Sequence, residues 1–124
     1  MVFDITSEST FTNLENWLYE LKNHSHQKIC ITLVGNKRDL SAEREVSYER
    51  ANEFVKKHNL DYYFETSAAT GENVEKVFFD LGADILGRIE KGVINVALDT
   101  AYGVKMGGKN KNKKYPSQGI GLAR

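Results

Sequence analysis

Two short loops hold the polar side chains that could do chemistry in this sequence. The first, residues 36–39 (Asn-Lys-Arg-Asp), follows an apolar stretch, and the second, residues 67–69 (Ser-Ala-Ala), follows an aromatic one. Their amide, ammonium, carboxylate and hydroxyl groups are hydrogen-bond donors and acceptors. We interpret the two loops as a candidate binding site, to which we assign no catalytic residue and no metal ligand. Taken alone, residues 36–39 could equally be a polar turn between a strand and a helix.

Three stretches are predicted to be the strands that position these loops. They cover residues 1–5, 28–34 and 61–66, and they are apolar or aromatic with few interruptions. Runs of this length without strict alternation are typical of strands that are covered on both faces of a parallel sheet. Each loop then follows the carboxyl end of a strand, which is where ligands bind in such sheets.

Apolar residues recur with a helical period between the strands. A first helix is expected around residues 11–21, capped by Ser9 or Thr10, a second over residues 47–58, and a third over residues 74–89 that stops at Gly92. The side chains expected to face the core are Phe11, Leu14, Leu18, Leu21, Tyr48, Ala51, Phe54, Val55, Val74, Val77, Phe78, Leu81, Ile85 and Ile89. Alternating strands and helices predict an α/β fold with three parallel strands and three helices.

The two loops together resemble the pair of loops that reads guanine in Ras-like GTPases. The resemblance to Rab-family small GTPases extends over residues 2–91, and its matching stretches are residues 2–18, 33–40, 44–54 and 65–78. These correspond to the C-terminal half of a Ras-like P-loop NTPase fold, so the first half of the G domain is expected to be missing. Residues 85–92 and 103–107 look most like the Rab branch that acts at the Golgi and at early and recycling endosomes.

The resemblance implies that the carboxylate of Asp39 accepts hydrogen bonds from guanine N1–H and from the 2-amino group. Adenine has neither donor there, and an unpaired carboxylate costs ~1–3 kcal/mol or more. The backbone N–H of Ala68 would donate to guanine O6. Ala69 stands where the family pattern commonly has lysine, with a modest expected effect because the main contact is the preceding amide.

Three further side chains are expected to support this base site. The aliphatic stem of Lys37 would cover the plane of the base, and Asn36 would tie the two loops together through its side-chain amide. Ser67 would orient Asp39 or the loop backbone. The nucleotide implied is GTP or GDP, contacted by this chain through the base alone.

The parts with which the family hydrolyses GTP do not occur in this sequence. There is no G-x-x-x-x-G-K-S/T motif, no switch threonine in its expected context, and no strand-end D-x-x-G followed by glutamine. Residues 84–87 match D-x-x-G by letters only, inside the third predicted helix, and Asp4 is interpreted as an acid at a strand end or helix start. Enzymatic activity is therefore uncertain, and Mg²⁺ is expected only with the missing half.

Charge is divided unequally between an acidic body and a basic tail. Residues 1–91 contain 11 Lys and Arg against 16 Asp and Glu, whereas residues 92–124 contain 6 against 1. We expect residues 92–124 to be a flexible tail and the acidic body not to bind nucleic acid. The lysines in residues 109–114 could add weak attraction to anionic lipids, or the tail could simply be solvated.

Anchors and targeting segments are not apparent in the sequence. No apolar run approaches the roughly 18–20 residues that span a bilayer, and residues 1–4 do not begin a secretory signal. Rab proteins usually end in prenylated cysteines, but no cysteine follows Cys30, so no prenyl anchor is visible. One cysteine also fits a reducing compartment.

Three functions from different classes remain open. In the first, the full-length form is a guanine-nucleotide-binding Rab GTPase that recruits effectors and exchange factors and regulates vesicle trafficking at the cytosolic face of endomembranes. In the alternative, the chain is a catalytically dead half-domain that acts as an interaction module or decoy. In the third, the chain binds the guanine base alone, with an expected dissociation constant of about 1 mM or weaker.

Overall fold

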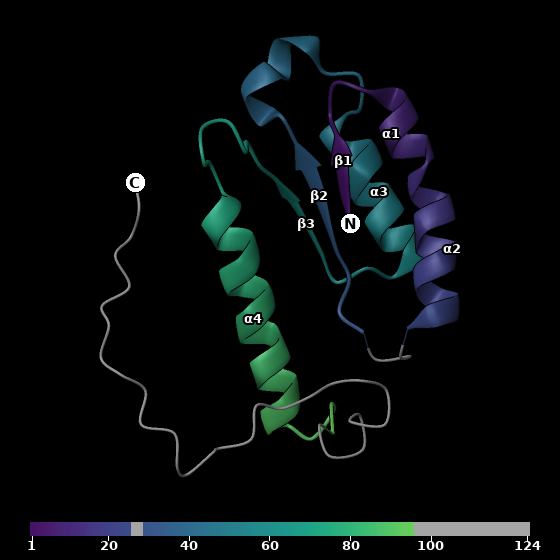
Figure 1. Ribbon diagram of the computed structural model, residues 1–124, viewed down its shortest axis with the longest axis vertical. Coiled ribbons are helices and arrows are strands. Elements are labelled where there is room, and N and C mark those ends of the chain that lie inside the picture. The colour runs from purple at the N-terminus through teal and green to yellow at the C-terminus, as the bar shows by residue number, and fades with distance from the viewer. Residues whose placement is uncertain (26–28, 96–124) are drawn as a thin grey trace, which may run out of the picture.

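The computed structural model describes residues 1–25 and 29–95 (Figure 1). Most of the predicted basic tail, including residues 103–107, lies outside the described residues. The elements in chain order are β1 (Val2–Asp4), α1 (Glu8–Thr12), α2 (Leu14–His24), β2 (Thr32–Asn36), the 3-10 helix η1 (Arg38–Glu43), α3 (Tyr48–His58), β3 (Tyr62–Glu65) and α4 (Val74–Glu90). No helix among these is long and apolar enough to cross a membrane.

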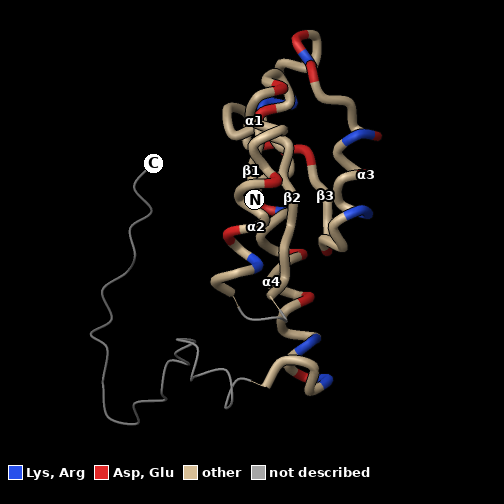
Figure 2. Tube along the Cα trace, turned by 90° about the vertical axis from the view of Figure 1, so that its right-hand side faces the viewer, with Lys and Arg blue, Asp and Glu red and all other residues tan. Residues whose placement is uncertain are grey.

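The three strands form one parallel sheet in the order β1-β2-β3. Figure 1 shows α1, α2 and α3 gathered on one side of the sheet and α4 on the other. The predicted α/β class with three parallel strands is therefore confirmed. Figure 2 shows acidic and basic residues interleaved along the helices and loops, while the central strand β2 contains none.

The hydrophobic core lies between the sheet and α1 to α3. Phe11 of α1 is at its centre, with its ring edge-on to Phe3 of β1 and to Phe54 of α3 at centroid distances of 5.1 and 5.5 Å. Leu33 of β2 is fully buried beside them. This cluster joins both α1 and α3 to the sheet, so it fixes the helices that precede and follow β2.

Gly35 allows the core to approach the central strand closely. A Cβ atom at this position would lie 2.8 Å from the Tyr63 hydroxyl, 2.9 Å from Ile5 Cγ2 and 3.1 Å from Phe3 Cζ. These distances leave no room for a side chain without moving its neighbours. The glycine just before Asn36 is thus a packing requirement of the strand.

The first predicted helix is divided into α1 and α2 at Asn13. The backbone of Asn13 stays close to helical, with φ −71° and ψ −13°, so the chain continues in the same direction. The expected caps Ser9 and Thr10 are wrong, because the helix begins earlier, with Ser7 as the N-cap residue. The Thr10 hydroxyl instead accepts from the Asp4 N–H at 3.0 Å and donates to the Ser7 carbonyl at 2.8 Å.

The second strand is displaced toward its carboxyl end relative to the prediction. Asn36 pairs in register with Asp4, which extends β2 two residues beyond Val34. At the other end β2 begins at Thr32, and the N–H of Ile31 donates to the side chain of Asp61 at 2.6 Å rather than to a strand. Residues 26–28 lie outside the described residues.

The predicted bounds and buried face of α3 are largely confirmed. Ser47 is the N-cap, and its hydroxyl accepts a hydrogen bond from the Arg50 N–H at 3.2 Å. Ala51 and the two apolar residues of the next turn are buried. Tyr48 is the exception at 48% exposed, and its ring contacts Tyr63 at the edge of the core.

The apolar stripe of α4 is only partly covered, which corrects the prediction for Phe78. Val77 is the single buried residue of this helix, whereas Phe78 is 73% exposed, Phe79 76% and Leu86 62%. The helix lies against β3, where Lys76 is 5.7 Å from the ring of Phe64. The described sheet has three strands and ends at β1, so it offers no further surface for these side chains.

Ion pairs hold the C-terminal end of α4, and the helix ends where it was predicted to end. Arg88 bridges two carboxylates, contacting Asp84 at 2.8 Å and also Asp61 just before β3. These contacts raise the pKa of Arg88. Gly92 follows the helix with φ +71° and donates its N–H to the Ile89 carbonyl, which is the turn expected of a glycine at this place.

We expect this 124-residue chain to self-associate through α4 and β1. Among the described residues, β1 pairs only with β2, and Phe78 and Phe79 of α4 are exposed; exposed aromatic side chains and a free strand edge both favour association in water. Light scattering should show an apparent mass that rises with concentration, and the double variant Phe78→Ser, Phe79→Ser should reduce the rise. Tyr19→Ser, which removes an aromatic ring 67% exposed on α2, is the control and should leave it unchanged. A monomer at all concentrations would contradict this expectation.

Candidate functional site

The two polar loops lie side by side at the carboxyl ends of β2 and β3. The Thr66 N–H donates to the Gly35 carbonyl at 2.9 Å, and the Arg38 N–H donates to the Thr66 carbonyl at 3.0 Å. These two bonds continue the sheet pairing past the strand ends. The parallel topology therefore brings the predicted site residues of both loops to one edge of the sheet.

Asn36, the last residue of β2, joins the two loops. Its side-chain oxygen accepts hydrogen bonds from the Ala68 N–H at 3.0 Å and from the Thr66 hydroxyl at 3.2 Å. The Ala68 amide is the group expected to donate to guanine O6. A ligand oxygen that reaches this amide must share or replace its bond to Asn36.

Ser67 and Asp39 form the second link between the loops. Ser67 is fully buried, and its hydroxyl donates to Asp39 Oδ1 at 2.7 Å while accepting from the Thr70 N–H at 3.1 Å. Asp39 lies in the first turn of η1 and is exposed. Within the described residues the Ser67 bond is the only hydrogen bond to this carboxylate, so its other oxygen is available to a ligand.

Lys37 is held in an uncommon backbone conformation and a specific ion pair. Its φ of +70° is in the left-handed region, and its ammonium lies 2.6 Å from Asp4 Oδ2. The other oxygen of Asp4 accepts from the Thr6 N–H at 2.8 Å and from its hydroxyl at 2.7 Å. Partial burial would raise the pKa of Asp4, but the bonds from Lys37 and Thr6 hold it below its usual value, and the Asp4 bond raises the pKa of Lys37.

Sequence reasoning missed the role of Asp4. It is the last residue of β1, and its register partner is Asn36 of β2. The available signal was its position, because an acid at the carboxyl end of one parallel strand lies beside the loop that follows the next. Asp4 therefore belongs to the site as the residue that orients Lys37.

Backbone hydrogen bonds within residues 67–72 hold the second loop in its conformation. The Ser67 N–H donates to the Glu72 carbonyl at 3.1 Å, and the Gly71 N–H donates to the Ser67 carbonyl at 2.8 Å. Gly71 has φ +81°, which favours glycine. Ala68 and Ala69 are exposed on this loop. The predicted site residues of the loop are thus placed by backbone bonds, with Ser67 buried and the two alanines outward.

An ion pair between the half-buried Arg44 and the buried Glu65 lies next to both loops, and sequence reasoning did not identify it. The Arg44 guanidinium donates two hydrogen bonds to the Glu65 carboxylate, at 2.7 and 2.8 Å, and the Tyr63 hydroxyl donates to the same carboxylate at 2.8 Å. Glu65 is 8% exposed. Burial would raise its pKa, but Arg44 and Tyr63 lower it, while burial and the Glu65 carboxylate raise the pKa of Tyr63.

A group with metal-ligand chemistry lies outside the two loops. Cys30, Asp61 and Asp84 have ligand atoms within 4.8 Å of one another. Arg88 already pairs with both carboxylates, and burial raises the pKa of the Cys30 thiol. The arrangement is accounted for as an ion-pair network between α4 and the sheet.

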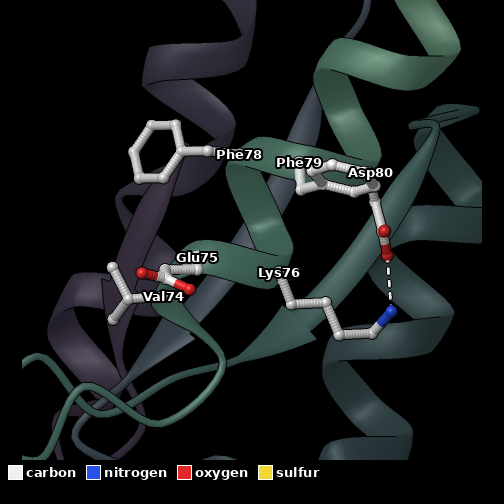
Figure 3. A pocket seen from close by; sticks show the side chains of 6 residues that line it. All are labelled: Val74, Glu75, Lys76, Phe78, Phe79 and Asp80. Carbon is white, nitrogen blue, oxygen red and sulfur yellow. Dashed lines mark hydrogen bonds and ion pairs between the residues drawn. The ribbon is translucent and has the colours of Figure 1, made fainter.

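A shallow pocket lies on the first turns of α4 (Figure 3). Its lining residues are Val74, Glu75, Lys76, Phe78, Phe79 and Asp80. Lys76 and Asp80 form an ion pair at 2.6 Å across one side of it. None of these residues belongs to the two loops, so the pocket is separate from the predicted site.

Comparison with protein families matches residues 1–87 of the chain to the Ras family. The matched range contains more than half of the chain. It includes both polar loops, the Asp4–Lys37 pair and the Arg44–Glu65 pair.

Proposed function

Because the chain belongs to the Ras family, we propose that its two loops bind the guanine base of GTP or GDP. The observation that carries this proposal is the hydrogen bond from the buried Ser67 hydroxyl to Asp39 Oδ1. It holds an exposed carboxylate in place with one oxygen bonded within the protein. A preorganised acceptor of this kind suits a ligand that presents two neighbouring donors.

Guanine presents such a pair in its N1–H and its 2-amino group. We assign Asp39 to these donors and the Ala68 N–H to the O6 acceptor. Adenine has an amino donor in place of O6 and lacks the two donors, so its binding would leave the carboxylate unpaired, at a cost of ~1–3 kcal/mol or more. The two loops are therefore proposed to select guanine over adenine.

The remaining predicted residues hold and cover the base in this proposal. Asn36 keeps the two loops in one register through its bonds to Thr66 and Ala68. Asp4 fixes the ammonium end of Lys37, and we assign the aliphatic stem of Lys37 to the face of the base. Ala69 is assigned a minor role at the loop tip. Phosphate and Mg²⁺ binding are assigned to the N-terminal half of a complete G domain.

We further propose that the whole protein is a Rab-type GTPase of vesicle trafficking at the cytosolic face of endomembranes. The support is the resemblance of residues 2–18, 33–40, 44–54 and 65–78 to that family, with residues 85–92 and 103–107 favouring the Golgi and endosome branch. Effectors and exchange factors are then its partners. Expression of the tagged full-length protein and microscopy of its location test this, and a diffuse signal in all nucleotide states would contradict it.

Titration with guanosine monophosphate tests the base-binding proposal directly on this chain. Contacts to the base alone imply a dissociation constant about millimolar. We expect the amide resonances of Asp39 and Ala68 to shift in a saturable manner with guanosine monophosphate. Adenosine monophosphate at the same concentrations should produce no comparable shift. Equal shifts with both nucleotides would show that the loops do not read guanine.

The exposed apolar side chains of α4 favour a second candidate, an interaction module. Phe79 and Leu86 are mostly in solvent, and contiguous exposed apolar surface often marks a contact with another protein. A sharp unfolding transition from a monomer, without guanine binding, would favour this function. Guanine-specific binding together with self-association would favour the nucleotide site.

A further inference from the structure

We propose that the Arg44–Glu65 ion pair is a positioning brace that sets the spacing of the two guanine-reading loops. Through this spacing it would set how strongly the loops prefer a base with the 2-amino group over one without it. The inference rests on the proposed base-binding function and assigns it a further determinant. Arg44 and Glu65 would act through Asp39 and Ser67 rather than by touching the base.

The brace links the residue that follows η1, after the first loop, to the residue that precedes the second loop. Arg44 directly follows η1, whose first turn contains Asp39. Glu65 is the last residue of β3 and directly precedes Thr66 and Ser67. The two-bond contact between guanidinium and carboxylate therefore ties both segments at points just outside the site.

The same turn is also bonded to the end of β1. The carbonyl of Ile5 accepts from the Glu45 N–H at 2.9 Å and from the Val46 N–H at 3.1 Å. Arg44 donates a further bond to the Val46 carbonyl at 3.1 Å. Since Ile5 follows Asp4, the residue that pairs with Lys37, the turn that contains Arg44 is bonded to the carboxyl ends of both β1 and β3.

The chemistry of the pair makes it a geometric device. Two parallel N–H to oxygen bonds fix both the distance and the orientation of the partners, which lysine cannot reproduce with a single ammonium. Glu65 is 8% exposed, and the Tyr63 hydroxyl occupies the same oxygen as one arm of Arg44. The carboxylate therefore has little freedom to accept a different partner geometry.

Arg44→Lys tests the brace while keeping the charge pair. The measured quantity is the ratio of affinities for guanosine and inosine monophosphates, which differ only in the 2-amino group. We expect a ratio of about tenfold in the unmodified chain, as for one hydrogen bond to a charged group. In Arg44→Lys the ratio should fall at least about threefold, because the Asp39 carboxylate is then no longer held toward the N1–H and the 2-amino group of guanine.

Arg50→Lys is the matched control. Arg50 makes the same kind of two-bond contact, to Glu8 at 2.6 and 2.5 Å, but it joins α3 to α1, and neither residue belongs to the two loops. The nucleotide ratio should be unchanged in this variant. A purely structural role for Arg44 predicts that its lysine variant lowers Tm but leaves the ratio unchanged, and that result would overturn the proposal.

Tyr63→Phe covers the case in which Arg44→Lys does not fold. It removes one hydrogen bond to Glu65 and retains the ring, so the brace is loosened with a smaller change in packing. We expect a smaller fall in the ratio, and no fall would count against the brace. Failure of the unmodified chain to bind either nucleotide would instead overturn the base-binding proposal, and the brace with it.

Discussion

Asp39→Asn is expected to weaken binding of guanosine monophosphate by about 10–100-fold and to transfer the preference to xanthosine monophosphate. A hydrogen bond to a charged group contributes about 1.5–3 kcal/mol, and each 1.4 kcal/mol is a tenfold change in affinity. Asparagine replaces one acceptor oxygen by a donor. Xanthine presents a 2-oxo acceptor where guanine presents the 2-amino donor, so it fits the changed side chain.

Titrations with both nucleotides, followed through the Ala68 amide resonance, measure this change. Asp80→Asn is a suitable control because Asp80 is a surface acid on α4 that pairs with Lys76, outside the two loops. It should leave both affinities unchanged. An unaltered preference for guanine in Asp39→Asn would refute the role assigned to Asp39, even if the chain still binds nucleotides.

Phe11→Ala is expected to reduce the free energy of unfolding by about 3–5 kcal/mol, the usual range for removing a buried phenylalanine side chain. Phe11 is 6% exposed, and its ring contacts Phe3 and Phe54 and lies under the Arg50 guanidinium, whose carbon is 4.9 Å from the ring centroid. The substitution removes contacts among β1, α1 and α3 together. Typical domains have only about 5–15 kcal/mol in total, so this single substitution should remove a large share of the stability.

Urea unfolding at low protein concentration, followed by circular dichroism, provides the measurement. Phe78→Ala is the matched control, since it makes the same chemical change at a side chain that is 73% exposed. Its effect should lie within about 0.5 kcal/mol of zero. Similar losses in both variants would contradict the core described for residues 1–25 and 29–95.

Local patterns were sufficient for much of this fold. The helical period located α3, and Gly92 marked the end of α4, because these signals depend on neighbouring residues. The period of α4 also predicted that Phe78 faces the core. That was wrong, because a period identifies an apolar stripe on a helix but not the width of the layer that covers it.

The order of strands along the chain was enough to predict that the two loops meet, since parallel strands place their carboxyl ends at one edge of a sheet. The hydrogen bonds from Ala68 to Asn36 and from Ser67 to Asp39 join the two loops as predicted. Their geometry agrees with the supporting roles expected of Asn36 and Ser67. Guanine contact by these residues stays a prediction until nucleotide binding is measured.

The types of residue at this edge, the order of the elements that present them, and the family to which they belong can all be read from the amino-acid sequence. The ion pairs of Lys37 with Asp4 and of Arg44 with Glu65, in contrast, are set by the fold. These partners belong to segments far apart in the chain, and their pairing depends on strand register and on the path of the turn after η1. Propensity and periodicity describe neighbours a few residues apart, so neither contains that information.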